Sequence, residues 1–338
     1  MEYRTNTKNF ALLIDGSAML TTKYFGNLSY EVKNAPDEER EKYFYTLLKA
    51  PNGAYINGVF PMFMEILELI SRYNPKYIVV AFDKNRNTFR RKLLPSYKAQ
   101  RAEKDVPLKE QFITMANILR RIGIPVCSND TFEADDLIGS LANILKQEVP
   151  CFLLTKDHDY LQLIDDEKRV RCLLIQSSSE KMENLSETYG NRPELYPNAY
   201  MFDDRVCLGV EGVYSYQIPD KKGLSGDTAD NISGVKGIGE KASVALLSHY
   251  KNIEEIYADI DIYGEIIVDK WKNEFYIKRA GIIYKALTAE NARETAFLCK
   301  RLATIITSLG KNFKKTYAMP NIKTDEINKV MAEYGFAR

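Results

Sequence analysis

The sequence predicts an α/β fold, in which a mostly parallel sheet is flanked by helices and followed by a helical region. The first observation behind this prediction is that short apolar runs alternate with segments whose apolar residues recur at helical spacing. The second is that several of these runs end at an aspartate, a residue typical of strand ends and turns. The third is length, because 338 residues can bury a full core and suggest one large domain or two.

Four apolar runs are predicted to be buried strands: residues 10–14, 77–82, 151–154 and 170–175. An aspartate or a pair of aspartates follows each of the first three, namely Asp15, Asp83, and Asp157 with Asp159. Ligands of parallel sheets bind beyond the carboxyl ends of the strands. A single aspartate at a strand end is usually a turn or cap residue, but several together indicate a site. We therefore expect these four side chains to share one rim of the sheet.

A cluster of three carboxylates lies within residues 131–139. Glu133, Asp135 and Asp136 precede apolar residues at helical spacing, which predicts a buried helix that begins here. An acidic first turn on the surface is the simpler interpretation, since the helix dipole favours negative charge there. With the strand-end aspartates nearby, however, the cluster would concentrate charge that protons or metal ions must compensate.

Residues 84–109 are rich in positive charge and contain only two acidic residues. The basic residues are Lys84, Arg86, Arg90, Arg91, Lys92, Lys98, Arg101, Lys104 and Lys109. Phe89 and Tyr97 are interleaved, and Pro95 interrupts any continuous helix. Such a run is often only a solvated face. Because it begins directly after Asp83, it is also a plausible electrostatic guide for a polyanion.

Residues 226–242 combine two more aspartates with a glycine-rich segment. The residues concerned are Asp227, Asp230, Gly234, Lys236, Gly237, Gly239 and Lys241. Two short helices joined by a glycine hairpin would expose backbone N–H groups that a phosphate can approach closely. Three glycines this close can also form a simple loop. The helix-forming residues 241–247 directly afterwards favour a helix-hairpin-helix DNA clasp.

The other segments are predicted from pattern alone. Residues 59–70, 253–263, 271–287 and 297–309 have helical spacing, and residues 36–42 are a charged, solvated excursion. Residues 176–200 are polar and contain Pro193 and Pro197, so we interpret them as an exposed loop or insertion.

Composition narrows the class of protein. Apolar content of 45% and charged content of 28% are ordinary for a globular protein, and the net charge of +1 says nothing by itself about nucleic acid. We expect no membrane span, since no run of about 18 uncharged apolar residues occurs. Residues 1–9 lack a signal-peptide core. The five scattered cysteines favour reduced thiols in a cytoplasm over a disulfide framework or a zinc site.

In this order the motifs resemble the 5′-nuclease domain of bacterial DNA polymerase I and its relatives, the 5′-3′ exonucleases and flap endonucleases. The matching stretches are LIDGS at 13–17, AFD at 81–83 with TFR at 88–90, YKAQR at 97–101, FEADD at 132–136, TKDHD at 155–159 with LQL at 161–163, GDTADN at 226–231 and GVKGIGEK at 234–241. Each motif is weak alone, but the ordered set is highly specific and covers roughly residues 10–250.

The resemblance implies a PIN-like α/β core over residues 1–220, with a basic helical arch at about 84–109 and an insertion at about 176–200. It implies a helical region with the helix-hairpin-helix motif over residues 221–338. It also implies two divalent ions, Mg²⁺ or Mn²⁺. Asp15, Asp83, Glu133 and Asp135 would form the first ion group, and Asp135, Asp157, Asp159, Asp227 and Asp230 the second, with Asp136 close by. Such carboxylates suit Mg²⁺ better than zinc.

The resemblance further assigns roles to basic residues. Lys98 and Arg101 match arch residues that contact the scissile phosphate, and Arg90 lies in a matching motif, so these three are the expected catalytic cations. DNA contacts are expected from Arg86 and Arg91 in the arch, and from Gly234, Lys236, Gly237, Gly239 and Lys241 in the hairpin, where the family often holds a potassium ion.

The implied function is a structure-specific 5′ nuclease that hydrolyses DNA at 5′ ends or 5′-flap junctions, in replication or repair. We expect branched or nicked duplex DNA as the partner, and a monomer that is stand-alone because no polymerase domain follows. Residues 21–53 match the family poorly, and residues 176–200 look inserted. Two alternatives remain. The filled acidic positions argue against a non-catalytic DNA-junction binder, and the helix-hairpin-helix motif argues against a PIN-type ribonuclease.

Overall fold

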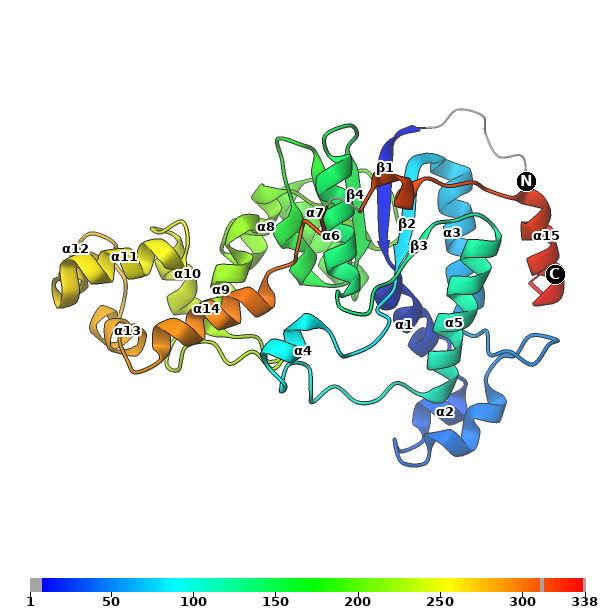
Figure 1. Ribbon diagram of the computed structural model, residues 1–338, viewed down its shortest axis with the longest axis horizontal. Coiled ribbons are helices and arrows are strands. Elements are labelled where there is room, and N and C mark those ends of the chain that lie inside the picture. The colour runs from blue at the N-terminus through cyan, green and yellow to red at the C-terminus, as the bar shows by residue number, and fades with distance from the viewer. Residues whose placement is uncertain (1–7, 311–312, 337–338) are drawn as a thin grey trace.

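Figure 1 shows the computed structural model of the chain, which describes residues 8–310 and 313–336. A six-stranded sheet lies at the centre, with helices on both faces, and an all-helical region extends to one side. Most of the polar N-terminal stretch considered above, residues 1–7, lies outside the described residues. Within the described residues, no helix combines the length and the apolar character needed to cross a bilayer.

The sheet is parallel except at one edge. Its strands, in the spatial order β3-β2-β1-β4-β5-β6, are β3 (Val126–Cys127), β2 (Pro75–Ala81), β1 (Lys8–Asp15), β4 (Cys151–Thr155), β5 (Val170–Ile175) and β6 (Ala199–Phe202). Only β6 pairs antiparallel, with β5. The chain runs outward in both directions from the central pair β1 and β4, so the switch point lies at the carboxyl ends of these two strands. The predicted mostly parallel α/β fold is confirmed.

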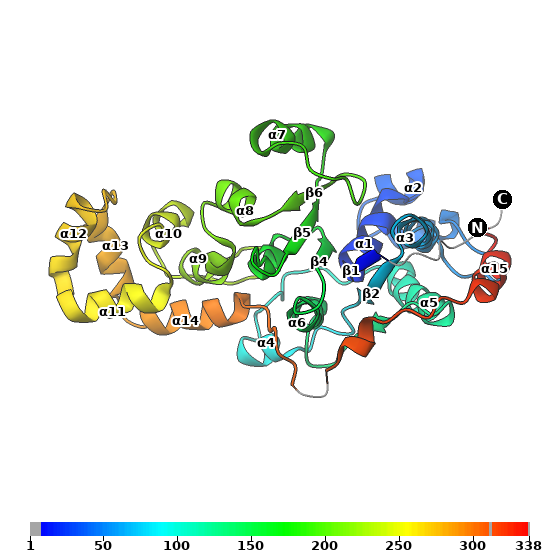
Figure 2. The ribbon, with the colours of Figure 1, turned by 90° about the horizontal axis from the view of Figure 1, so that it is seen from above.

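Alternate residues of the strands pack into two separate cores. In β1, Leu13 faces the core that contains α6 (Ala134–Leu145), whereas Leu12 and Ile14 face the opposite core. That second core is built by α1 (Gly16–Gly26), α3 (Val59–Tyr73), α5 (Val106–Arg121) and α15 (Thr324–Glu333). Figure 2 shows α6 on one side of the sheet and α1 and α3 on the other. Both faces are covered, which explains why the strands are continuous apolar runs.

The helical region follows the sheet. It contains α8 (Asp204–Glu211), α9 (Ile218–Ser225), α10 (Glu240–Leu247), α11 (Ile253–Tyr263), α12 (Ile267–Asn273), α13 (Ala280–Leu287) and α14 (Ala292–Ala303). After α14 the chain returns to the α/β core and ends on α15, against α3. The expected boundary between residues 220 and 221 falls inside α9, and its position stays a prediction.

Two expected helices are wrong in part. The one expected over residues 271–287 is interrupted between α12 and α13, where Tyr276 and Arg279 adopt left-handed backbone conformations with φ of 54° and 59°. The one expected over residues 297–309 stops at Ala303, because the backbone beyond it is hydrogen-bonded to side chains of the core.

Several short elements lie where no regular structure was expected. The segment 176–200 contains the exposed helix α7 (Ser179–Tyr189) and the start of β6. Residues 21–53 contain α2 (Tyr30–Asn34) and the 3₁₀ helix η1 (Arg40–Thr46), and the remaining 3₁₀ helices are η2 (His158–Leu163), η3 (Ser215–Gln217), η4 (Gly264–Ile266) and η5 (Lys315–Ala318). In the expected helical arch only α4 (Phe89–Leu93) is helical before α5 begins, in keeping with Pro95. We use "arch" below for residues 84–105.

Candidate functional site

The carboxyl end of β1 places Asp15 at the switch point of the sheet. Its Oδ1 accepts a hydrogen bond from the backbone N–H of Ala18 (3.0 Å), which caps α1, and its Oδ2 accepts one from the Thr155 hydroxyl (2.8 Å) at the end of β4. The carboxylate is buried, and this burial, together with the charges of Asp83 and Asp157, raises the pKa of Asp15 to about 7. A positive charge beside Asp15 would therefore stabilise its ionised form.

Glu133 and Asp135 lie at the start of α6, and Asp83 lies next to them. Glu133 is the N-cap of this helix and closes a capping box with the third helical residue. Asp83 lies beside it, since its Oδ1 accepts a hydrogen bond from the backbone N–H of Ala134 (2.9 Å). Burial, with the charges of Asp136 and Glu133, raises the pKa of Asp135 well above its ordinary value, although Arg90 opposes this shift. A cation near Asp135 would relieve this cost.

Arg90 and Asp136 form a buried ion pair next to the site carboxylates. The Arg90 Nη1 and Nη2 atoms donate to the two carboxylate oxygens of Asp136, each at 2.8 Å, and Nε and Nη2 also donate to the carbonyl oxygens of Leu302 and Thr304. Asp136 accepts a further hydrogen bond from the backbone N–H of Ile306 (2.8 Å). Arg90 Nη1 also lies 3.7 Å from Oε1 of Glu133 and 3.9 Å from Oδ1 of Asp135. The expected roles of Arg90 in catalysis and of Asp136 close to an ion stay predictions.

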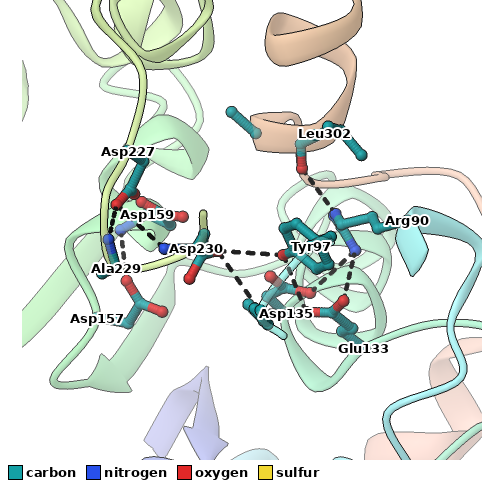
Figure 3. Close-up of polar contacts among 12 residues, drawn as sticks. Arg90, Tyr97, Glu133, Asp135, Asp157, Asp159, Asp227, Ala229, Asp230 and Leu302 are labelled. Atoms are coloured by element: carbon teal, nitrogen blue, oxygen red, sulfur yellow. Dashed lines mark hydrogen bonds and ion pairs between the residues drawn. The ribbon is translucent and has the colours of Figure 1, made fainter. Parts of the chain in front are cut away.

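A second carboxylate group forms on the other side of the site (Figure 3). Asp159, Asp227 and Asp230 each offer one oxygen, and these three oxygens lie within 4.8 Å of one another. Asp157, exposed at the end of β4, caps η2 by accepting a hydrogen bond from the backbone N–H of Asp159 (2.9 Å). Burial and the charge of Asp157 raise the pKa of Asp159 to about 6. The group thus has the spacing and the oxygen donors of a hard-cation site.

Sequence reasoning missed Lys222, which lies within this second group. Its ammonium contacts Asp159 and lies 2.6 Å from Oδ2 of Asp227. Burial acts to raise the pKa of Asp227, but the hydrogen bond from Lys222 acts in the opposite direction, and the pKa of Asp227 lies below its ordinary value. The only sequence signal was a lysine five residues before Asp227, on a segment to which we assigned no motif.

The arch joins the two carboxylate groups. Lys98 Nζ lies 2.6 Å from Oε2 of Glu133 and 3.5 Å from Oδ2 of Asp230. Arg101 Nη2 lies 2.5 Å from Oδ1 of Asp230, and the buried Tyr97 hydroxyl donates to Oδ2 of the same residue at 3.1 Å. Figure 3 shows Tyr97 between Asp230 and Glu133. Two expected catalytic cations, Lys98 and Arg101, are therefore in the site.

Backbone and amide contacts hold the arch against the loop that carries Asp227 and Asp230. The Gln100 Nε2 atom donates to the carbonyl oxygens of Thr228 (2.9 Å) and Ala229 (3.1 Å). The Lys98 backbone N–H donates to the carbonyl oxygen of Asp230 (2.9 Å), although Lys98 has a left-handed φ of 52°. Such a conformation costs free energy in a residue with a side chain and is held here by tertiary contacts.

A basic cavity of about 610 Å³ lies between the arch and α5 and reaches the first carboxylate group, which contains Asp83 and Glu133. Asp83 and Glu133 line it on the site side, and Arg86 and Arg91 are among its cationic residues. The Arg86 guanidinium also donates to carbonyl oxygens of the arch at Arg101 and Ala102, so it stiffens the arch as well as charging the cavity.

Residues 226–239 connect α9 to α10, and the glycine hairpin, residues 234–239, forms the second part of this connection. Gly234 and Gly237 have φ of 64° and 90°, and Gly239 is the N-cap of α10. Lys236 and Lys241 are exposed beside it. The same segment begins with Asp227 and Asp230, so it links an exposed, positively charged turn directly to the second carboxylate group. The connection between the two helices, residues 226–239, is therefore longer than the short hairpin that the sequence led us to expect there.

The donor set fits divalent cations. The two groups consist of carboxylate oxygens only, and their burial raises the pKa of Asp15, Asp135 and Asp159, as expected where a hard cation normally supplies the compensating charge. Among the described residues all five cysteines are buried and unpaired, and they take no part in the site.

Comparisons with known proteins agree with this geometry. A family model described as the N-terminal resolvase-like domain of 5′-3′ exonucleases matches residues 10–190, and one described as their C-terminal SAM fold matches residues 213–325. The 5′-3′ exonuclease of Buchnera aphidicola subsp. Baizongia pistaciae is 31% identical over 330 residues, which cover 96% of this chain and 91% of that relative.

Longer relatives match over one part of their length. DNA polymerase I of Caldicellulosiruptor bescii is 33% identical over 283 residues, 83% of this chain, but the chain spans only 29% of that relative. The solved structure of the bacteriophage T5 flap endonuclease, a pseudo-enzyme–product complex with DNA and metal ions, has the same fold. Its TM-score is 0.55 with 19% identity, and the match covers 88% of this chain and 90% of that one. The resemblance predicted from the motifs is confirmed: the chain belongs to the 5′-3′ exonuclease family.

Proposed function

We propose that the protein is a divalent-metal-dependent nuclease that hydrolyses DNA phosphodiesters at 5′ ends or 5′-flap junctions. The observation that carries this proposal is the arrangement of two carboxylate groups beside a basic cavity. Tyr97 and Lys98 bridge the two groups, and Arg101 is paired with Asp230 of the second. A protein that only binds DNA gains nothing from concentrated negative charge at this place.

The residues that would hold two Mg²⁺ or Mn²⁺ ions fall into the two groups. Asp15, Asp83, Glu133 and Asp135 would serve the first ion, and Asp135, Asp157, Asp159, Asp227 and Asp230 the second. When bound, the ions supply an activated water nucleophile and stabilise charge on the attacking and leaving oxygens. Asp136 would contribute indirectly, because it fixes the start of α6, which carries Glu133 and Asp135.

The chain's own cations have separate tasks. Lys98 and Arg101 are paired with site carboxylates, and divalent ions would compete for these carboxylates and release both side chains towards a scissile phosphate. Arg101 is about half exposed, with 49% of its side-chain surface accessible, so it can reorient without a change of fold. Arg90, which is 1% exposed, has no such access and acts as a positioning residue.

Duplex DNA would be held at the glycine hairpin. Lys236, Lys241 and the backbone at Gly234, Gly237 and Gly239 form a turn at the N-terminus of α10 that suits phosphate, and a backbone-held K⁺ would add to it. The T5 enzyme of the same fold was solved with DNA and metal ions, which supports this choice of partner. All these groups come from one chain, so we expect a monomer to be active.

The experiment that tests the proposal is cleavage of 5′-labelled flap, nicked, blunt and single-stranded DNA and of matched RNA, with Mg²⁺ and with EDTA. We expect Mg²⁺-dependent cleavage of flap and nicked DNA. Tight binding of flap DNA without Mg²⁺-stimulated cleavage would instead identify a junction binder, and preferential cleavage of RNA would identify a ribonuclease.

A further inference from the structure

The last turn of α9 holds both ends of the connection that carries the glycine hairpin. Lys222 Nζ lies 2.6 Å from Oδ2 of Asp227, at the start of the connection, and the Lys222 carbonyl oxygen accepts a hydrogen bond from the backbone N–H of Gly226 (2.9 Å). Lys221 Nζ lies 2.7 Å from Oε1 of Glu240, the first residue of α10. Two consecutive lysines therefore fasten the start and the end of the connection to one helical turn.

The middle of the connection is also fixed to α9. The backbone N–H of Val235 donates to the carbonyl oxygen of Leu224 (2.8 Å). A Cβ at Gly234 would lie only 2.7 Å from the same carbonyl oxygen, and Gly234 has a left-handed φ of 64°, so this close approach requires glycine. The connection thus folds back onto α9 at its start, its middle and its end.

Lys221 has a second anchor on the side of the sheet. Its Nζ donates to the backbone carbonyl oxygen and to Oε2 of Glu211 at the end of α8, each at 3.0 Å. Oε1 of Glu211 lies 2.7 Å from Nδ1 of His158, which stands between Asp157 and Asp159 in the chain. Figure 2 shows α9 next to both α8 and α10. One ammonium group therefore links the end of the hairpin to the segment that carries two of the site carboxylates.

The position of Lys221 suits this linking task and excludes contact with DNA. Lys221 is only 8% exposed. Burial acts to lower its pKa, but the contacts with Glu240 and Glu211 raise the pKa above its ordinary value, so the charge is kept. Lys236 and Lys241 are exposed and have no carboxylate oxygen within 4.0 Å in the described part of the chain. These two lysines are free for phosphates, whereas Lys221 is committed to carboxylates of the protein.

The span between the hairpin and the second carboxylate group decides which phosphodiester is cut. In the proposed function the hairpin holds the duplex, and the carboxylates hold the ions that act on one phosphate. Successive base steps of a duplex strand lie about 3.4 Å apart along the axis. A displacement of the hairpin by about this distance would bring a neighbouring phosphodiester to the ions.

We propose that Lys221 is a positioning residue that sets the point of cleavage, because it fixes the glycine hairpin relative to the second carboxylate group through Glu240 and Glu211. The inference rests on the proposed nuclease function and deepens it, since it names the contact that selects the phosphodiester. Lys221 touches neither DNA nor the reacting atoms. Its loss should therefore change where the strand is cut more than how fast it is cut.

The test is Mg²⁺-dependent cleavage of a 5′-labelled flap duplex with a fixed junction, resolved to single nucleotides. Lys221→Ala should raise the share of cuts at neighbouring positions about threefold, the effect of losing one partly exposed ion pair. Lys221→Arg should keep the pattern of the unmodified protein. Glu240→Ala should reproduce the shift, and the double variant should cut like Lys221→Ala alone, because both changes break the same contact.

Lys251→Ala is the matched control. It removes an exposed lysine between α10 and α11 that is distant in sequence from the connection, and it should leave the pattern unchanged. Glu240 has 70% of its side-chain surface accessible, so Glu240→Ala leaves the buried contacts of Lys221 with Glu211 in place if Lys221→Ala fails to fold. An unchanged pattern in Glu240→Ala would overturn the inference whatever happens to the rate, because a loss of stability lowers the amount of folded protein and not the point of cleavage.

A hydroxyl-radical footprint on the same flap duplex, without Mg²⁺, measures the position of the DNA independently of cleavage. The edge of the protected duplex should be sharp for the unmodified protein and should move or spread by about one nucleotide in Lys221→Ala and Glu240→Ala. Unchanged cuts with an unchanged footprint would overturn the positioning role while the nuclease stands. Absence of all cleavage, with a displaced footprint in the variants, would refute the nuclease function and retain the positioning role.

Discussion

The guanidinium of Arg90 holds both carboxylate oxygens of Asp136 at 2.8 Å, and the two residues have exposed fractions of only 1% and 0%. The same guanidinium binds the carbonyl oxygens of Leu302 and Thr304, where the chain leaves α14 and returns to the core. The pair therefore joins the start of α6, which carries Glu133 and the neighbouring site carboxylates, to the C-terminal return of the chain.

Asp136→Asn should destabilise the protein by about 3–5 kcal/mol, because it removes the carboxylate that binds the buried Arg90 guanidinium through two hydrogen bonds and leaves only the more distant Glu133 and Asp135, at 3.7 and 3.9 Å. Urea unfolding monitored by circular dichroism measures this difference. Lys42→Ala breaks the exposed pair with Glu39 and should cost less than about 1 kcal/mol, which makes it a matched control. An Asp136→Asn protein as stable as the unmodified one would show that the pair is not a structural junction.

Asp135→Ala should abolish Mg²⁺-dependent cleavage while DNA binding stays largely intact. Asp135 belongs to both proposed ion groups. Burial and its acidic neighbours raise the pKa of Asp135, and a bound cation would lower it again. Single-turnover cleavage and flap binding by fluorescence anisotropy are the two measurements. Glu68→Ala, on the exposed face of α3, is the control. Undiminished cleavage by the Asp135 variant would rule out the two-ion assignment.

Local pattern was enough to predict much of the fold. The apolar run 170–175 coincides with β5, and the helical spacing of 253–263 coincides with α11. The two-residue strand β3 is too short to show any period, and β6 was hidden in a polar segment whose strand character depends on pairing with β5. The helix expected over 297–309 stops early because Arg90, Gln162 and Asp136 bind its backbone.

The site was predictable where topology decides it. Asp15 and Asp83 follow neighbouring parallel strands, so one rim had to hold both. The burial of Arg90 and the position of Lys222 between Asp159 and Asp227 depend on segments distant in sequence, and no local pattern carries that information. The same holds for the contact of Gln100 with the 228–229 carbonyls.

Arg101→Ala should lower the single-turnover cleavage rate by about 10²–10³-fold and weaken duplex binding far less, because its guanidinium acts on charge at one phosphate. Arg101→Lys should recover part of the rate, since a charge is restored without the planar fork. Rate and affinity are measured on the same flap substrate. The reverse result, a large loss of affinity with an unchanged rate, would make Arg101 a binding residue only.

The acid dependence of stability should contain a contribution from Glu148. Hydrogen bonds from Lys315, Lys76 and Tyr77 lower the pKa of Glu148 to about 2 from its ordinary value of 4.5. Because the folded pKa is the lower one, this stabilisation is complete above pH 4.5 and is lost as the pH falls towards 2. Glu148→Gln should therefore lower the melting temperature at pH 7 and have little effect near pH 2.

High salt should shrink the Glu148 effect, since the group is exposed and its ion pairs are screened. Melting temperatures at pH 2.5, 4 and 7, in 20 mM and 500 mM NaCl, give the comparison. A difference between the two proteins that grows towards low pH would contradict the assignment.

Gln100→Ala should reduce cleavage several-fold by loosening the arch rather than by removing a reacting group. Its amide bridges the arch to the carbonyl oxygens of Thr228 and Ala229, next to Asp227 and Asp230, so its loss frees both partners of the contact. We expect a higher Mg²⁺ concentration for half-maximal cleavage and a melting temperature within about 1 °C of the unmodified protein, because Gln100 is exposed. Gln147→Ala, at an exposed position remote from the site, should change neither quantity. If the Gln100 variant needed no more Mg²⁺ than the unmodified protein, the position of the arch would not control the second carboxylate group.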